Sequence, residues 1–248
     1  MILQLSGIGK RFGDMVVIPD FALSVEEGEF VGVIGPNGAG KTTLFALIAG
    51  SLSCDCGDVR LDGRSVTQLS ANARCHAGIG RTFQIPQPFE TMTVYENALV
   101  AAAFGAGLHG DQARLAARDA LDRCGILLLG NVVAGRLTLL QRKRLELARA
   151  IATRPRLLLL DEVAGGLTDG EMAQLLELVT AINASGVTVL WIEHLVHALV
   201  SVARRLIVMA EGRLIADGEP AFVLQDRTVR EVYLGAEVEA TEPGRVTH

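Results

Sequence analysis

A glycine-rich segment between two apolar runs constrains this chain more than any other feature of its sequence. The run before it, residues 30–34, has the length of a buried strand, and the run after it, residues 43–49, has helical character. The segment fits the pattern G-x-x-x-x-G-K-[ST] and consists of Gly35, Pro36, Asn37, Gly38, Ala39, Gly40, Lys41, Thr42 and Thr43. A strand, a loop and a helix in this order predict a site that holds ATP by its phosphates.

The residues of this loop suit the chemistry of a bound triphosphate. Glycines allow successive backbone N–H groups to turn inward around the β-phosphate, and the helix N-terminus adds its partial positive charge. We expect Lys41, one of three lysines in the chain, to reach the β- and γ-phosphates. Thr42 is expected to provide a hydroxyl ligand to Mg²⁺, with Thr43 beside it.

Two adjacent carboxylates follow another apolar run. Four leucines at residues 157–160 precede Asp161 and Glu162. We expect Asp161 to hold the hydration shell of Mg²⁺ at the end of a strand, and Glu162 to polarise a water molecule for in-line attack on the γ-phosphate. The alternative is a strand that runs out into a solvated loop. The phosphate-binding loop upstream in the same sheet favours the catalytic interpretation.

His194 lies two residues beyond the apolar run 187–192. It is therefore expected at a carboxyl end of the sheet, where open α/β folds bind their ligands, and within reach of the γ-phosphate. A histidine in this position without other motifs is more often a capping or packed residue. The order of the other motifs favours a catalytic role.

The order of apolar runs predicts an α/β fold with a P-loop nucleotide hydrolase core. Short apolar runs joined by helical segments indicate strands buried on both faces of a mostly parallel sheet with flanking helices. In the second half of the chain these runs are residues 157–160, 187–192 and 206–209. Near the N-terminus, β-prone runs separated by Gly and Pro predict an antiparallel β subdomain, at residues 2–5, 15–18 and 21–25.

The middle of the chain predicts an inserted helical subdomain. Residues 93–152 are rich in Ala, Leu, Arg and Glu, with helical spacing at 112–124 and 142–151, and we place the subdomain at about 85–150. Thr168 and Glu171 predict a capping box that begins a helix running to about residue 183. We expect one domain over residues 1–235 and a polar tail at 236–248.

Composition excludes several classes of protein. No apolar run approaches the roughly 18 residues that a membrane-spanning helix needs, and the N-terminus lacks the features of a secretory signal, so we expect a cytoplasmic location. The net charge is −5 and the largest basic cluster is Arg142-Lys143-Arg144, which disfavours nucleic acid as a partner. Cys54, Cys56, Cys75 and His76 suggest a metal site, but Cys-x-Cys is too tight for the common zinc spacing, and reduced thiols are favoured.

These elements, in this order, resemble the ABC transporter ATPase family along nearly the whole chain. The resemblance implies that Phe12 stacks on adenine, and that Gln84 approaches Mg²⁺ where the helical subdomain begins. It also implies that residues 138–150 form the family's signature loop and helix, so that Thr138 and Gln141 contact ATP held by a second ATPase subunit. The further partners implied are two transmembrane permease subunits and, indirectly, a solute-binding protein, at the inner face of the cell membrane.

Finer features resemble one branch of that family, the ATPases of branched-chain amino acid importers. These features are Arg81-Thr82-Phe83-Gln84, Asn97, the turn Gly165-Gly166-Leu167 and the segment Glu231-Val232-Tyr233-Leu234-Gly235. Importers of urea and short amides share much of the pattern. The resemblance implies ATP-driven uptake of branched-chain amino acids or related small solutes.

Two departures from the family pattern bear on activity. The usual signature is Leu-Ser-Gly-Gly-Gln, whereas this chain has Leu139 and Leu140 in place of the two glycines. Thr138 keeps a hydroxyl, but Leu140 has a branched side chain where glycine allows close approach of the backbone to phosphate. We therefore expect a weakened site on the partner's nucleotide, and asymmetric hydrolysis in a heterodimer. The second departure is Thr168, where many members have Asp.

Two other functions fit parts of this pattern. ABC ATPases that act on ribosomes or DNA usually carry two cassettes, a long coiled coil or a basic surface, whereas this chain has one cassette and a negative net charge. A degenerate subunit that clamps ATP without hydrolysing it is supported only by the two signature leucines. The residues that argue against it are Lys41, Asp161, Glu162 and His194.

Overall fold

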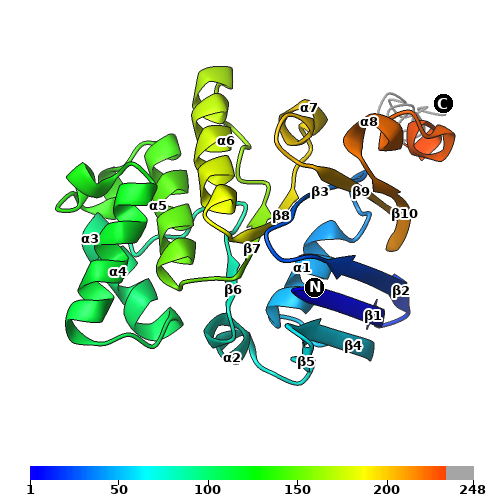
Figure 1. Ribbon diagram of the computed structural model, residues 1–248, viewed down its shortest axis with the longest axis horizontal. Coiled ribbons are helices and arrows are strands. Elements are labelled where there is room, and N and C mark those ends of the chain that lie inside the picture. Colours follow the sequence, from blue (N-terminus) through cyan, green and yellow to red (C-terminus); the bar gives the residue numbers. More distant parts are fainter. Residues whose placement is uncertain (233–248) are drawn as a thin grey trace, which may run out of the picture.

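A six-stranded, mostly parallel sheet forms the centre of the structure, a computed structural model that describes residues 1–232 (Figure 1). The strand order is β10-β9-β3-β8-β7-β6, and β10 runs antiparallel to β9. The strands are β3 Phe30–Ile34, β6 Ile79–Arg81, β7 Leu157–Asp161, β8 Thr188–Ile192, β9 Arg205–Ala210 and β10 Arg213–Gly218. The predicted strands β3, β7, β8 and β9 are confirmed, and they pair in parallel.

Both faces of this sheet are buried, because alternate residues of each strand belong to different hydrophobic clusters. In β7, Leu158 and Leu160 pack on one face, and Leu157 and Leu159 pack on the other. Helices cover the first face, namely α5 (Leu139–Ala152), α6 (Asp169–Ala184) and α7 (Val196–Val200). The other face packs on α1 (Lys41–Ala49) and a second sheet. This double burial explains why these strands are continuously apolar in sequence.

The second sheet has four antiparallel strands in the order β2-β1-β4-β5. They are β1 Leu3–Phe12, β2 Met15–Val25, β4 Cys56–Leu61 and β5 Arg64–Ser65. The predicted antiparallel subdomain is confirmed, but the runs 15–18 and 21–25 belong to a single strand whose register with β1 shifts between Ile8 and Lys10. The prediction did not include β4 and β5.

Helices from the middle of the chain lie together at one side of the molecule (Figure 1). They are α3 (Val94–Val100), a π-helical turn (Ala101–Gly105), α4 (Gly110–Arg123) and α5. Short helices elsewhere are α2 (Ala71–His76) and α8 (Pro220–Val223), and 3-10 turns occur at Leu127–Leu129 and Ala134–Arg136. The helices predicted at 112–124 and 142–151 are confirmed, and so is the capping box of Thr168 and Glu171 that begins α6.

Two sequence predictions concern the ends and boundaries of these elements. The boundaries at about 85, 150 and 235 stay predictions, and the tail 236–248 and the residues Tyr233, Leu234 and Gly235 lie outside the described residues. Within the described part of the chain, none of the helices has the length and hydropathy needed to cross a membrane.

Cys124 closes α4 and should be the least reactive thiol of the chain. All four cysteines are free thiols, and the exposed Cys56 contrasts with the fully buried Cys124, where burial raises the pKa of the thiol to about 12. Because the thiolate is the nucleophile, we expect Cys56 to react with a disulfide reagent in the native protein and Cys124 to react only in urea. Cys124→Ser serves as the control. Labelling of Cys124 at the rate of Cys56 under native conditions would contradict the packing described here.

Candidate active site

The glycine-rich loop connects β3 to α1 in a backbone conformation that requires glycine. A Cβ atom on Gly35 would lie 2.1 Å from the carbonyl oxygen of Met209, so no other residue fits there. Gly40 caps α1 in the left-handed region, with φ of 92°. Residues after it begin α1 directly, so their N–H groups point out of the helix N-terminus, where a phosphate would be stabilised.

Lys41 folds back onto the loop that precedes it. Its Nζ donates hydrogen bonds to the carbonyl oxygens of Gly35 (2.7 Å) and Pro36 (3.0 Å), and the residue is only 5% exposed. Burial lowers the pKa of Lys41, while the carboxylates of Glu162 and Asp161 oppose that shift. The lysine therefore holds the loop in shape and lies close to both predicted catalytic carboxylates.

A depression of about 340 Å³ opens over this loop. Its lining includes most of the predicted phosphate-binding residues, namely Asn37, Gly38, Ala39, Gly40, Lys41, Thr42 and Thr43, together with Glu162. Met15 and Val17 of β2 complete it and were not predicted. Phe12 is not part of this lining: it is 47% exposed at the end of β1, with Lys10 Nζ 5.5 Å from its ring centre. Its role in adenine stacking stays a prediction.

Glu162 lies at the centre of a cluster at the carboxyl edge of the sheet. Its Oε1 is 2.6 Å from Nε2 of His194, and its Oε2 accepts a hydrogen bond from the side-chain amide of Gln84. Since β7 and β8 are neighbours in parallel, the residues that follow them meet at one edge. The structure therefore brings together three residues that are distant in sequence: Gln84 lies 78 positions before Glu162, and His194 lies 32 positions after it. Gln84 and His194 contact different oxygens of the one carboxylate.

The backbone at Glu162 is held in an unusual conformation. Its φ is 48°, in the left-handed region that non-glycine residues rarely occupy. Its N–H donates to the carbonyl oxygen of Ile192 at 2.9 Å, which continues the pairing with β8 by one residue. Strained residues of this kind persist where surrounding contacts fix them, and they gather at active sites.

Asp161 is nearly fully buried and has a cationic partner that the sequence analysis did not identify. Its Oδ2 lies 3.1 Å from Nη2 of Arg81, the last residue of β6. Burial raises the pKa of Asp161, and the hydrogen bond and charge of Arg81 oppose that shift. The available signal was the place of Arg81 three residues before Gln84, but β6 is too short to recognise as a strand in the same sheet.

The predicted signature residues lie at the N-terminus of α5 and contact each other. Thr138 caps the helix: its hydroxyl accepts the N–H of Gln141 (3.4 Å), while the side-chain oxygen of Gln141 accepts the N–H of Thr138 (3.0 Å). Neither belongs to the depression over the glycine-rich loop of the same chain, and α5 stands apart from α1 (Figure 1). The side chain of Leu139 lies beside Gly166: a Cβ atom added to Gly166 would be 3.3 Å from Cδ2 of Leu139.

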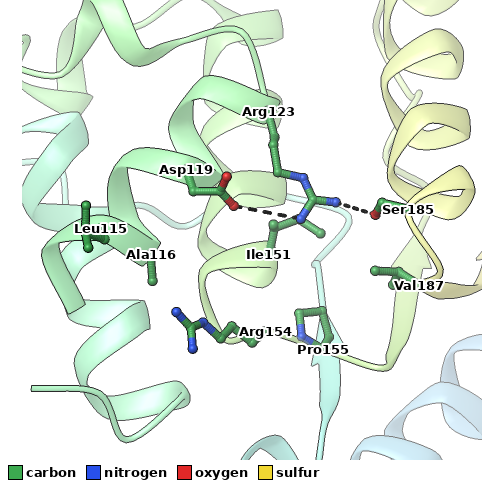
Figure 2. A pocket seen from close by; sticks show the side chains of 9 residues that line it. All are labelled: Leu115, Ala116, Asp119, Arg123, Ile151, Arg154, Pro155, Ser185 and Val187. Atoms are coloured by element: carbon green, nitrogen blue, oxygen red, sulfur yellow. Dashed lines mark hydrogen bonds and ion pairs between the residues drawn. The ribbon is translucent and has the colours of Figure 1, made fainter. Parts of the chain in front are cut away.

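A second depression, of about 440 Å³, lies between α4 and the carboxyl-terminal ends of α5 and α6 (Figure 2). Arg123 spans part of it and donates to the hydroxyl of Ser185 at 2.7 Å. Pro155 and Val187, which also line it, precede β7 and β8, so it faces the amino ends of these strands. It contains none of the predicted site residues and is not the nucleotide site. In the described residues, no group of three or more His, Cys, Asp or Glu is placed to hold a metal.

The loop, the carboxylates at the sheet edge and the helical insertion together define a nucleotide-dependent ATPase of the cassette type. A sequence model described as ABC transporter matches residues 18–165, and a second, described as branched-chain amino acid ATP-binding cassette transporter, matches residues 213–239. The chain belongs to the ABC transporter ATP-binding protein family, and it is an ATPase.

Individual relatives and a solved structure agree with this family assignment. The chain is 38% identical to the high-affinity branched-chain amino acid transport ATP-binding protein BraF of Pseudomonas aeruginosa, over 94% of this chain and 98% of that protein. It is 33% identical to the lipopolysaccharide export system ATP-binding protein LptB of Escherichia coli, over 94% and 97%. A crystal structure of an ATP-binding cassette of an ABC transporter in its ADP conformation matches with a TM-score of 0.84, at 32% identity, over 94% and 98%.

These comparisons confirm the family, the fold class and the ATPase activity predicted from the sequence. They also confirm the branch, since the second sequence model and the first relative both carry the name of branched-chain amino acid transport. Members of the family bind nucleotide, form dimers and pair with membrane subunits. The roles of the individual site residues stay predictions.

Proposed function

We propose that this chain powers the uptake of branched-chain amino acids, or related small solutes, by hydrolysing ATP at the inner face of the cell membrane. The match of residues 213–239 to the branched-chain amino acid model favours this solute class over the lipopolysaccharide named for another relative. The observation that carries the catalytic part is the placement of Glu162 between His194 and Gln84, beside the phosphate-binding loop.

Mg²⁺ fits the residues present at the sheet edge. Mg²⁺ prefers oxygen ligands, and Thr42, Asp161 and Gln84 offer a hydroxyl, a carboxylate and an amide oxygen. Burial raises the pKa of Asp161 and so disfavours its charged form, and a second cation besides Arg81 would stabilise that form. When bound, the ion would neutralise charge on the β- and γ-phosphates.

Glu162 is the proposed general base, and its neighbours orient it. Its two oxygens face different partners, so His194 and Gln84 fix the plane of the carboxylate. A carboxylate held in this way can accept a proton from the attacking water, while Lys41 and the loop N–H groups hold the γ-phosphate. His194, at 44% side-chain exposure, is open to a phosphate from above the loop.

The permease subunits have a candidate docking groove on the opposite flank from α6. A depression of about 240 Å³ lies among α1, α2, β6 and α5, and Phe83, which is half exposed, lines it. Exposed Phe89 and Phe104 border the groove: Arg149, a lining residue, lies 5.2 Å from the Phe89 ring, and His76 of α2 contacts the Phe104 carbonyl at 2.7 Å. Exposed apolar side chains grouped in this way mark protein interfaces.

Dimerisation places the signature of one subunit over the ATP of the other. The N-terminus of α5 suits a phosphate approaching from a partner, because Thr138 is exposed there and its side chain bonds within the cap, to the N–H of Gln141. Leu139 has a packing role on Gly166, whereas Leu140 lies in the first turn without that contact. Leu140 supports the prediction of a weakened site on the partner's nucleotide, which in a heterodimer would make hydrolysis asymmetric and in a homodimer would affect both sites.

Restoring glycine at the signature tests this proposal. We expect Leu140→Gly to raise ATP turnover by about tenfold, because removing the side chain lets the existing backbone N–H approach the phosphate, and one such donor to a transition-state oxyanion contributes this much or more in other enzymes. The substitution should lower helix stability by about 1 kcal/mol. Turnover of the assembled transporter is the measurement, and Leu139→Gly, which removes the contact with Gly166, is the matched control. Equal turnover in wild type and Leu140→Gly would contradict a weakened site.

Transport itself is tested in vesicles that contain the permease subunits, the solute-binding protein and this chain. We expect ATP-dependent accumulation of labelled leucine, isoleucine or valine that is lost in Glu162→Gln. Accumulation of urea or a short amide instead would move the solute assignment within the branch. Coupling to lipopolysaccharide release, without amino acid uptake, would overturn it.

A further inference from the structure

Glu193 is a buried acid that no part of the reaction described above uses. It is 2% exposed and lies between Ile192, the last residue of β8, and His194. Burial raises the pKa of Glu193, and the charge of the nearby Glu162 adds to this shift, while hydrogen bonds oppose it. A buried acid beside a second carboxylate is costly, so its presence calls for a specific contact.

The contact is to the loop that follows β7. Oε1 of Glu193 accepts the backbone N–H of Ala164 at 2.7 Å, and the same oxygen accepts the indole N–H of Trp191 at 3.1 Å. Ala164 is two residues after Glu162. The carboxylate of Glu193 therefore ties the end of β8 to the loop that carries Glu162.

The bond from Ala164 to Glu193, called the tether below, is one of two hydrogen bonds that hold the strained residue Glu162. Glu162 has a positive φ, and it is fixed on its amino side by the bond from its own N–H to Ile192 O and on its carboxyl side by the bond from Ala164 to Glu193. The two acceptors are Ile192 and Glu193, the consecutive residues that precede His194 at the end of β8. The two bonds thus join the segments that carry Glu162 and His194, whose side chains lie 2.6 Å apart.

A buried cation from another element supports the ionised state of this acid. Lys143 of α5 is 5% exposed, and the charge of Glu193 opposes the lowering of the lysine pKa by burial. Lys143 lies five residues after Thr138, so the helix that begins at the signature contributes charge to the tether. The loop after β7 and the end of β8 thus meet at Glu193, and the charges of Glu193 and of Lys143 on α5 influence each other.

We propose that Glu193 is a positioning residue for ATP hydrolysis, which holds the Glu162 loop against His194 through the bond from Ala164. This rests on the proposed role of Glu162 as the base. The role requires the reach of the side chain more than its charge, because a neutral amide oxygen at the same place accepts the same N–H group.

Two conservative variants separate reach from charge. Glu193→Asp keeps the carboxylate but shortens the side chain by one methylene, and it is expected to lower kcat of the assembled transporter by about tenfold or more with little change in KM for MgATP. Glu193→Gln keeps the reach and is expected to retain most of the turnover. Trp191→Phe removes the other donor to the same oxygen, keeps an aromatic ring beside Phe30, and serves as the matched control.

Hydrogen exchange reports the tether directly. The amide of Ala164 should exchange faster in Glu193→Asp than in wild type or Glu193→Gln, while peptides from α4 remain unchanged. In the Glu162→Gln background, Glu193→Asp should cause no further loss of turnover, because the base that it positions is already absent.

The outcomes distinguish this inference from the proposed function. Loss of activity in Glu193→Gln with full activity in Glu193→Asp would show that charge matters and reach does not, and would overturn the positioning role. A rise in KM without a fall in kcat would overturn it as well. Turnover that survives in Glu162→Gln would refute the role of Glu162 itself, whereas loss in Glu162→Gln beside full activity in Glu193→Asp would refute only the role of Glu193.

Discussion

Glu162→Gln is expected to lower kcat for ATP hydrolysis by roughly 100- to 10,000-fold, the range found when a general base is removed. The substitution removes the proton acceptor and leaves the side-chain length unchanged. MgATP affinity should change little, because we expect the loop and Lys41, rather than Glu162, to hold the phosphates. Steady-state turnover and direct nucleotide binding, measured on the same preparation, check both statements.

A matched control for this substitution lies one helix farther along the chain. Glu171→Gln makes the same chemical change at an exposed acid whose carboxylate accepts the N–H and the hydroxyl of Thr168 in the capping box of α6. It should lower stability slightly and keep turnover. Equal losses of kcat in both variants would point to a general effect of removing an acid and would contradict the assignment of the base.

The strands that the sequence predicted are those buried on both faces. Every residue of Leu157–Asp161 and Thr188–Ile192 is buried, so each strand is dominated by an uninterrupted apolar run. In contrast, β10 is only partly buried, and β6 has three residues, one of which is glycine. β6 has no pattern of its own, because its place comes from pairing with a strand that is remote in sequence, Ile79 with Leu157. β10 follows β9 after a short turn and lies at the edge of the sheet, where its residues are only partly covered.

The same distinction holds for the candidate active site. The glycine-rich loop, Glu162 and His194 were found because their residue types follow strands in a known order. Arg81 and Glu193 were missed because their importance comes from contacts across neighbouring strands and loops, with Asp161 and with Ala164. A single arginine or glutamate in the sequence gives no sign of such a partner.

One departure from the family pattern gains a physical reason from the structure. Leu139 could be replaced by glycine only with loss of its contact to Gly166, whose φ is 77°. The turn at Gly165 and Gly166 and the signature therefore fit each other within one chain. Leu140 follows in the first turn of α5, and Leu140→Gly tests its effect on a partner's nucleotide.

Lys41→Met is expected to weaken MgATP binding by roughly 10- to 100-fold, which corresponds to losing a hydrogen bond to a charged group worth about 1.5–3 kcal/mol. Turnover should fall further, because Lys41 is also expected to reach the γ-phosphate, where negative charge is rearranged during hydrolysis. Arg60→Ala removes one positive charge from the exposed side of β4 and serves as the control, with MgATP affinity expected to stay within threefold or so of wild type.

The stability of the nucleotide-free protein separates binding from folding in this variant. Lys41 donates to Gly35 and Pro36, which stabilises the loop, but its burial lowers the lysine pKa, which shows that the charged form is held at a cost. These effects oppose each other, so we expect the unfolding temperature without nucleotide to change little. The rise in unfolding temperature on adding MgATP should shrink in proportion to the lost affinity. A large fall without nucleotide, together with a full MgATP-induced rise, would instead make Lys41 a structural residue of the loop rather than a ligand of the phosphates.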